Sequence, residues 1–153
     1  MSLIVVDASV TVKWFQPGAD ESDSERALAL LQGIKNGDLT LCQPSHWLAE
    51  VSAVLARLNP ATAPDDIDDL YEIRFRRIEN RSVYTVACTL SCDLNHHLFD
   101  TLYHAVALTI NDAVLVTSHQ HYYGKAHRYG SISLLTDFSV CSVAEQNLGH
   151  RQP

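Results

Sequence analysis

Short apolar runs alternate with longer amphipathic segments along the chain. The runs are typical of strands buried on both faces, and they predict β-strands at residues 3–6, 39–42, 83–86, 113–116 and 132–135. Apolar residues at helical spacing predict helices at residues 24–36, 44–58, 64–77, 88–94, 100–110 and 119–129, after a short helical stretch that ends near Phe15. Because strands that alternate with helices form covered parallel sheets, we expect the α/β class: one three-layer α/β/α domain around a parallel sheet of about five strands.

The length and composition fit a single domain. The 153 residues are 46% hydrophobic and 19% charged, which supplies one well-buried core, and no repeat or linker divides them. We expect residues 1–148 to form the domain and residues 149–153 to be a disordered tail. No apolar run approaches the ~20 residues that span a bilayer, and the first residues lack the basic segment of a secretory signal. We expect a cytoplasmic protein without a membrane partner, whose cysteines are reduced, mostly buried thiols: Cys42, Cys88, Cys92 and Cys141.

The charge balance limits how the protein could meet nucleic acid. With 18 acidic and 11 basic residues the formal net charge is -7, which argues against binding nucleic acid by bulk positive charge. A local patch with bound cations is still compatible with this balance. The main basic cluster is interpreted as a solvated helix end, with phosphate contact or an acidic partner segment as alternatives: Arg74, Arg76, Arg77 and Arg81. The apolar helices at residues 44–58 and 64–77 could also form a groove for a partner's helix.

Three acids stand where a parallel sheet places its functional crevice, at the carboxyl ends of the strands. Asp7 follows the first strand, Glu50 lies beside the core-facing side of its helix, and Asp100 opens another helix. Each has an ordinary explanation: Asp7 and Asp100 are good helix N-caps, and Glu50 could pair with Arg57. Clustered carboxylates, however, repel one another unless cations neutralise them. Carboxylate oxygens favour Mg²⁺ or Mn²⁺, and such a site suits phosphodiester hydrolysis.

Other polar residues fit this crevice less well. Asp112 precedes a strand and so belongs to the opposite edge of the sheet, and Asp137 follows the last strand, which we expect to be an edge strand. His96 and His97 are interpreted as loop residues rather than metal ligands, because adjacent side chains rarely point at one site. The segment at residues 119–129 carries histidines, tyrosines and two cations. It is interpreted as a solvated helix face, with RNA contact through Lys125 and Arg128 as the alternative.

Four segments, in order and at matching spacing, resemble the motifs of PIN-domain nucleases. They are residues 4–10, 44–51, 98–107 and 115–119. The resemblance implies that Asp7, Glu50 and Asp100 hold one or two Mg²⁺ or Mn²⁺ ions and activate water for RNA cleavage. The fourth motif commonly carries an acid where this chain has His119. The residues that could complete this part of the site, as a fourth ligand or around a water, are Ser9, Thr117, Ser118 and His119.

The size of the chain is similar to that of the VapC-type toxins of prokaryotic toxin–antitoxin pairs. That resemblance implies a metal-dependent endoribonuclease, a homodimer and a cognate antitoxin that inhibits it. The alternative is a PIN-fold module that binds RNA or protein with weakened or lost catalysis, because His119 replaces the usual fourth acid. A phosphatase on a related scaffold is disfavoured, because Asp7-Ala8-Ser9 lacks the second acid of a DxD pattern.

Overall fold

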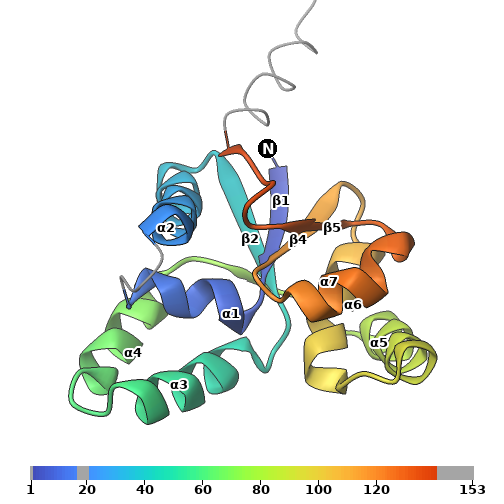
Figure 1. Cartoon of the computed structure of the whole chain (residues 1–153), viewed down its shortest axis with the longest axis horizontal. Helices are drawn as coiled ribbons and strands as arrows, with labels where there is room; N and C mark the ends of the chain where they lie inside the picture. Colours follow the sequence, from blue (N-terminus) through green and yellow to red (C-terminus); the bar gives the residue numbers. More distant parts are fainter. Residues whose placement is uncertain (1, 17–20, 141–153) are drawn as a thin grey trace, which may run out of the picture.

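The computed structural model describes residues 2–16 and 21–140. Within these residues five strands form one parallel sheet in the order β3-β2-β1-β4-β5, which confirms the predicted fold class (Figure 1). The strands are β1 (Ser2–Val6), β2 (Leu39–Gln43), β3 (Arg76–Arg77), β4 (Ala113–Thr117) and β5 (Ile132–Leu134). As predicted, the last strand lies at an edge of the sheet.

Helices cover both faces of the sheet. Figure 1 shows α1, α2, α3 and α4 on one side and α5, α6 and α7 on the other, as right-handed crossovers require when the strand order reverses. The first group comprises α1 (Ala8–Thr11), the 3₁₀ helix η1 (Val12–Trp14), α2 (Glu21–Asn36), α3 (Trp47–Leu58) and α4 (Ala63–Glu72). The second comprises α5 (Arg81–Leu94), α6 (Leu98–Thr109), α7 (Gln120–Ala126) and the 3₁₀ helix η2 (His127–Tyr129).

The strand order places the site. The chain runs outward from β1 through β2 to β3 and then returns to β4 on the other side of β1, so β1 and β4 are neighbours at the reversal point. Val6 lies opposite Val116 in their parallel register. Because parallel strands end at the same edge of the sheet, Asp7 and the residues that follow Thr117 come together there.

The predicted strand at residues 83–86 is wrong, because these residues belong to α5. Asn80 caps this helix by accepting a hydrogen bond from the Val83 backbone N–H at 3.1 Å. Val83, Ala87 and Leu90 then recur at helical spacing on its buried face. The run Val-Tyr-Thr-Val has high strand propensity, but burial of a helical face overrides it.

The predicted helix at residues 64–77 ends earlier, at Glu72, and the chain continues into the two-residue strand β3. Arg76 and Arg77 pair with Cys42 and Gln43 of β2. The basic cluster is therefore not a solvated helix end, since Arg76 and Arg77 lie on an edge strand and Arg81 begins α5.

The prediction of mostly buried cysteines is also wrong for the described part of the chain. Cys42 is buried on β2, whereas Cys88 and Cys92 are exposed on α5. Cys141 and the predicted tail at residues 149–153 lie outside the described residues. No helix in residues 2–16 or 21–140 is both long enough and apolar enough to cross a membrane.

Candidate active site at the carboxyl ends of β1 and β4

Asp7 is held from both sides by hydroxyl groups. Its Oδ1 accepts a hydrogen bond from Ser9 Oγ at 2.5 Å, and its Oδ2 accepts one from the Thr117 hydroxyl. The Val10 backbone N–H also donates to Oδ1 at 3.3 Å, so Asp7 is the N-cap of α1 as well. The cap explanation therefore holds for this residue, and it is compatible with a place in the candidate site.

The two hydroxyls connect Asp7 to the turn after β4. Ser9 Oγ accepts a hydrogen bond from the Ser118 backbone N–H at 3.1 Å, and Thr117 Oγ1 accepts one from the His119 backbone N–H at 3.0 Å. Because each hydroxyl has a backbone donor on its oxygen, its own hydrogen is directed at the carboxylate. The structure thus brings three of the predicted fourth-motif residues around Asp7.

Burial dominates the electrostatics of Asp7. It raises the pKa of the carboxyl group above its ordinary value, and the nearby charge of Asp100 adds to this effect. The hydrogen bonds from Ser9, Thr117 and Val10 act in the opposite direction without cancelling it. A carboxylate in this position favours a compensating positive charge, which a divalent cation supplies.

Glu50 lies in the first turn of α3 and pairs with a histidine one turn earlier. Its Oε2 is 3.2 Å from His46 Nε2, and the same nitrogen is 2.9 Å from the Phe99 carbonyl oxygen at the start of α6. Arg57, the alternative partner expected for Glu50, is not the residue that pairs with it in the structure. Through His46 the amino-terminal ends of α3 and α6 are held together.

Asp100 lies in the first turn of α6 and pairs with His96 in the same way. Oδ2 of Asp100 is 2.8 Å from His96 Nε2. The loop interpretation of His96 was therefore incomplete, because its side chain contacts a candidate ligand. His97 is exposed and its ring faces Phe99.

Tyr103 connects the three acids. Its side chain is fully buried in α6, and its hydroxyl lies beside the Glu50 carboxylate without forming a well-aligned hydrogen bond to any described residue. Burial raises the pKa of this hydroxyl far above its usual range, and the charges of Glu50, Asp7 and Asp100 raise it further. The hydroxyl therefore stays protonated and is a donor available to the acid cluster.

The donor set fits a hydrated hard cation. In the described ranges, no three histidine, cysteine or acidic side chains are arranged to hold a metal ion by themselves. Mg²⁺ does not need such a cage, since it keeps several waters and is usually bound through one or two carboxylates. Asp7 and Asp100 are close enough for the charge of Asp100 to raise the pKa of Asp7, and the charges of both raise the pKa of the Tyr103 hydroxyl.

Three other candidate residues have defined contacts in the structure. His119 is the N-cap of α7, where its Nδ1 accepts from the Tyr122 backbone N–H at 3.0 Å. The Lys125 ammonium reaches inward to the Leu94 carbonyl oxygen at 3.3 Å and to His96 Nδ1 at 3.4 Å. Arg128 is exposed and stacks over the Tyr129 ring at 5.0 Å.

One positioning residue, Gln43, was missed at the sequence level. It is fully buried at the end of β2, where its Oε1 accepts from the Val6 N–H at 3.2 Å and its Nε2 donates to the Val6 carbonyl at 2.8 Å. These two side-chain hydrogen bonds take the place of backbone pairing between β1 and β2 next to Asp7. A glutamine that ends an otherwise apolar strand was the available signal. His46 and Tyr103 lie inside recognised motifs but were not singled out.

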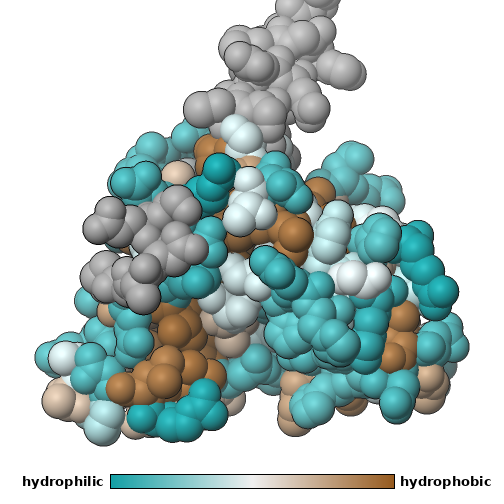
Figure 2. Space-filling view, viewed as in Figure 1, coloured by the Kyte–Doolittle hydropathy of each residue, from teal (hydrophilic) through white to brown (hydrophobic). Residues whose placement is uncertain are grey.

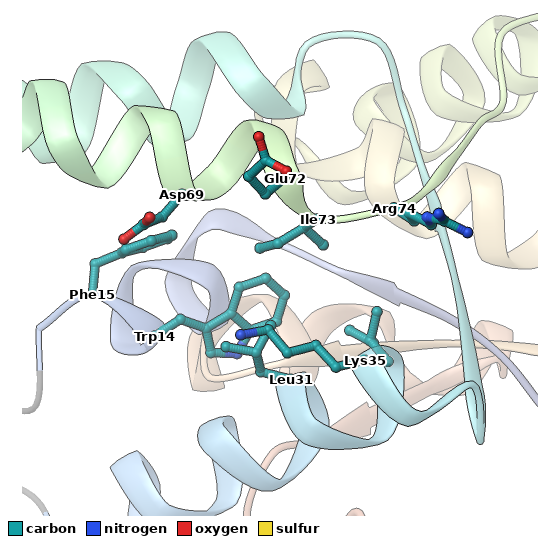
Figure 3. Close-up of a pocket in the computed structure, with 9 residues that line it drawn as sticks. Trp14, Phe15, Leu31, Lys35, Asp69, Glu72, Ile73 and Arg74 are labelled. Atoms are coloured by element: carbon teal, nitrogen blue, oxygen red, sulfur yellow. The ribbon is translucent and has the colours of Figure 1, made fainter.

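A separate groove of about 470 Å³ lies between η1, α2 and α4. Its apolar residues are Trp14, Phe15, Leu31, Ile34 and Ile73. Figure 3 shows Asp69 and Glu72 on the α4 side and Lys35 on the α2 side, with Arg74 at one end. In Figure 2 apolar surface gathers over α3 and α4, at the lower left of this face.

Comparison with known proteins agrees with this geometry. The model of the PIN domain family matches residues 4–127, a range that contains Asp7, Glu50 and Asp100. A chain in the crystal structure of VapBC2 from Rickettsia felis bound to a DNA fragment from their promoter has a similar fold, with a TM-score of 0.60 and 16% sequence identity. The similarity covers 86% of this chain and 96% of that chain. None of the curated proteins compared with the chain matches it in sequence. From the family match, the chain belongs to the PIN-domain family.

Proposed function

We propose that the protein is a cytoplasmic, divalent-metal-dependent endoribonuclease and the toxin of a toxin–antitoxin pair. The observation that carries this proposal is the half-buried Asp7 carboxylate at the carboxyl end of β1, which two hydroxyls hold and whose pKa the charge of Asp100 raises. Membership of the PIN family supports nuclease chemistry, and the fold shared with a chain of a VapBC complex supports the toxin role.

In this proposal Asp7 and Asp100 would hold the cation, with Glu50 beside them. A bound Mg²⁺ or Mn²⁺ would activate water and stabilise the charge that develops on the phosphate. The Ser9 and Thr117 hydroxyls keep both oxygens of Asp7 oriented. Glu50, with Oε2 paired to His46, would accept a proton at Oε1, and the Tyr103 hydroxyl, which has no well-aligned partner among the described residues, would be free to donate to the cluster.

The groove between η1, α2 and α4 supports an antitoxin as partner. An amphipathic helix buries its apolar face in such a groove, and the flanking Lys35 and Asp69 would select its polar side chains by charge. We also propose a homodimer, which the resemblance to VapC-type toxins implies and which light scattering of the purified protein would test.

Cleavage of a structured RNA tests the enzymatic proposal. The wild type, Asp7→Asn, Asp100→Asn and the matched control Asp112→Asn are incubated with Mg²⁺ or Mn²⁺, and with EDTA. We expect metal-dependent cleavage that falls by about 10²-fold or more in the first two variants and is unchanged in the control, because Asp112 precedes β4 at the opposite edge of the sheet.

The alternative, a PIN-fold binding module, gives a different result in the same experiment. Equal RNA binding by the wild type and both site variants, without cleavage in either metal, would contradict the enzymatic proposal. His119 already serves as the cap of α7, so its presence in place of an acid does not by itself favour the module.

A further inference from the structure

His96 occupies a more constrained position than a loop residue requires. Its backbone N–H donates to the Ser91 carbonyl at 3.0 Å, and its own carbonyl accepts from Ser91 Oγ at 2.5 Å. The Tyr122 ring lies 4.8 Å from the imidazole, centroid to centroid. Only 10% of the His96 side chain is exposed, although it belongs to the connection between α5 and α6. The ring is therefore fixed from the backbone and from one face.

The two nitrogens of this ring have partners of opposite kind. The Lys125 ammonium, which can only donate, is 3.4 Å from Nδ1, so Nδ1 is the acceptor. The ring hydrogen is then on Nε2, which donates to Asp100 Oδ2 at 2.8 Å. Lys125 is itself held by the Leu94 carbonyl at 3.3 Å. The result is a directed chain of donors from α7 through His96 to the carboxylate.

We infer that His96, oriented by Lys125, is a positioning residue that fixes the Asp100 carboxylate for cation binding. This inference rests on the proposed function. With Oδ2 held by the His96 Nε2–H donor, Oδ1 is left for the cation. Hydrogen-bonding partners of this kind set the orientation of metal ligands, and their loss costs roughly 10- to 100-fold in affinity. Lys125 then acts inside the protein rather than on RNA.

Mn²⁺ affinity, measured by electron paramagnetic resonance of the free ion, tests this inference without any cleavage assay. We expect His96→Ala to weaken Mn²⁺ binding by about 10-fold or more, and His96→Gln, which keeps a donor near the position of Nε2, to restore it to within about 3-fold. Lys125→Met should give an intermediate loss. The matched control is His127→Ala, because His127 is exposed and bonds only to the Tyr123 carbonyl.

A second readout is the tautomer of His96 in the metal-free protein, measured by ¹⁵N-¹H correlation of the ring. We expect hydrogen on Nε2 in the wild type and a mixture of tautomers in Lys125→Met. This measurement still tests the orientation by Lys125 if His96→Ala fails to fold.

Each result separates the two proposals. A wild type that binds Mn²⁺ no more tightly than Asp7→Asn would overturn the proposed function, and this inference with it. Equal Mn²⁺ affinity in the wild type and a folded His96→Ala, or hydrogen on Nδ1 in the wild type, would overturn this inference alone.

Discussion

Asp7 serves the fold and the site in opposing ways. As the N-cap of α1 it satisfies the Val10 N–H, which favours folding. Desolvation and the charge of Asp100 raise the pKa of its carboxyl group, which means that the folded protein favours the neutral form. The charge that the proposed cation would need is therefore destabilising when no cation is present, as is common for functional groups.

The first prediction is that Asp7→Asn stabilises the metal-free protein. A raised pKa in the folded state contributes stability below the unfolded pKa, and this contribution is lost as the pH rises through the folded pKa. The amide side chain in Asp7→Asn carries no charge at pH 7, so it does not incur this destabilisation. We expect the free energy of unfolding in EDTA to rise by about 1 kcal/mol, which raises Tm by roughly 2–4 °C. Differential scanning calorimetry checks this, and a Tm below that of the wild type would contradict it.

The second prediction concerns His104, which is buried in α6. Its Nδ1 is 2.9 Å from the Tyr122 hydroxyl and its Nε2 is 2.7 Å from the Gly130 carbonyl oxygen. Burial lowers the pKa of His104, so the unfolded chain takes up the proton more readily. The stability it contributes is complete above the unfolded pKa of about 6.5 and is lost as the pH falls below that value.

We therefore expect the wild type to lose free energy of unfolding between about pH 7 and pH 5, and His104→Gln to lose less over the same interval. Urea denaturation at several pH values measures both slopes. His127→Gln is the control, because His127 is exposed. Identical slopes in the wild type and His104→Gln would show that His104 does not carry the effect.

At the scale of elements, the helices and strands that follow one clear period could be predicted, and those that depend on distant partners could not. The run at residues 83–86 has high strand propensity, whereas the buried face of α5 and its Asn80 cap favour a helix. β3 has no signal of its own, since two exposed arginines become a strand only by pairing with Cys42 and Gln43.

The same division applies to the candidate site. Asp7 and the turn at Thr117 could be predicted as site residues because each directly follows a strand, and the ends of parallel strands meet at one edge of the sheet. The histidines that hold Glu50 and Asp100 were present at helical spacing from each acid, yet the pairing depends on where each helix begins. Tyr103 and Gln43 could not be assigned without knowing which interior surface they face.

The third prediction is that Gln43 stabilises the β1–β2 pair beside the site. In Gln43→Ala the Val6 N–H and carbonyl lose their partners in the interior. We expect the free energy of unfolding to fall by about 2–4 kcal/mol. Urea denaturation measures it, and Gln32→Ala is the control because Gln32 is exposed and bonds only to Asn36. Equal losses in both variants would contradict the role of Gln43.

At the scale of the molecule, the groove and the acid cluster are formed by largely different residues. The groove is lined from η1, α2 and α4, whereas the cluster lies at the ends of β1 and β4 and at the starts of α3 and α6. A change on the groove floor should therefore separate partner binding from catalysis.

The fourth prediction uses Leu31, which is half-buried on that floor. We expect Leu31→Arg to prevent copurification with the proposed antitoxin, because a buried cation opposes an apolar helix face, while RNA cleavage is retained. Leu58→Arg is the control, since Leu58 is exposed and does not line the groove. Retained copurification by Leu31→Arg would place the partner elsewhere.

The two outermost strands have a further consequence for the free protein. β3 consists of two arginines and β5 of three residues, so neither border of the sheet offers a long template on which another chain could extend it. The charge on β3 also repels an identical border brought against it. Copies that accumulate in excess of any partner are thereby protected from joining into fibrous aggregates.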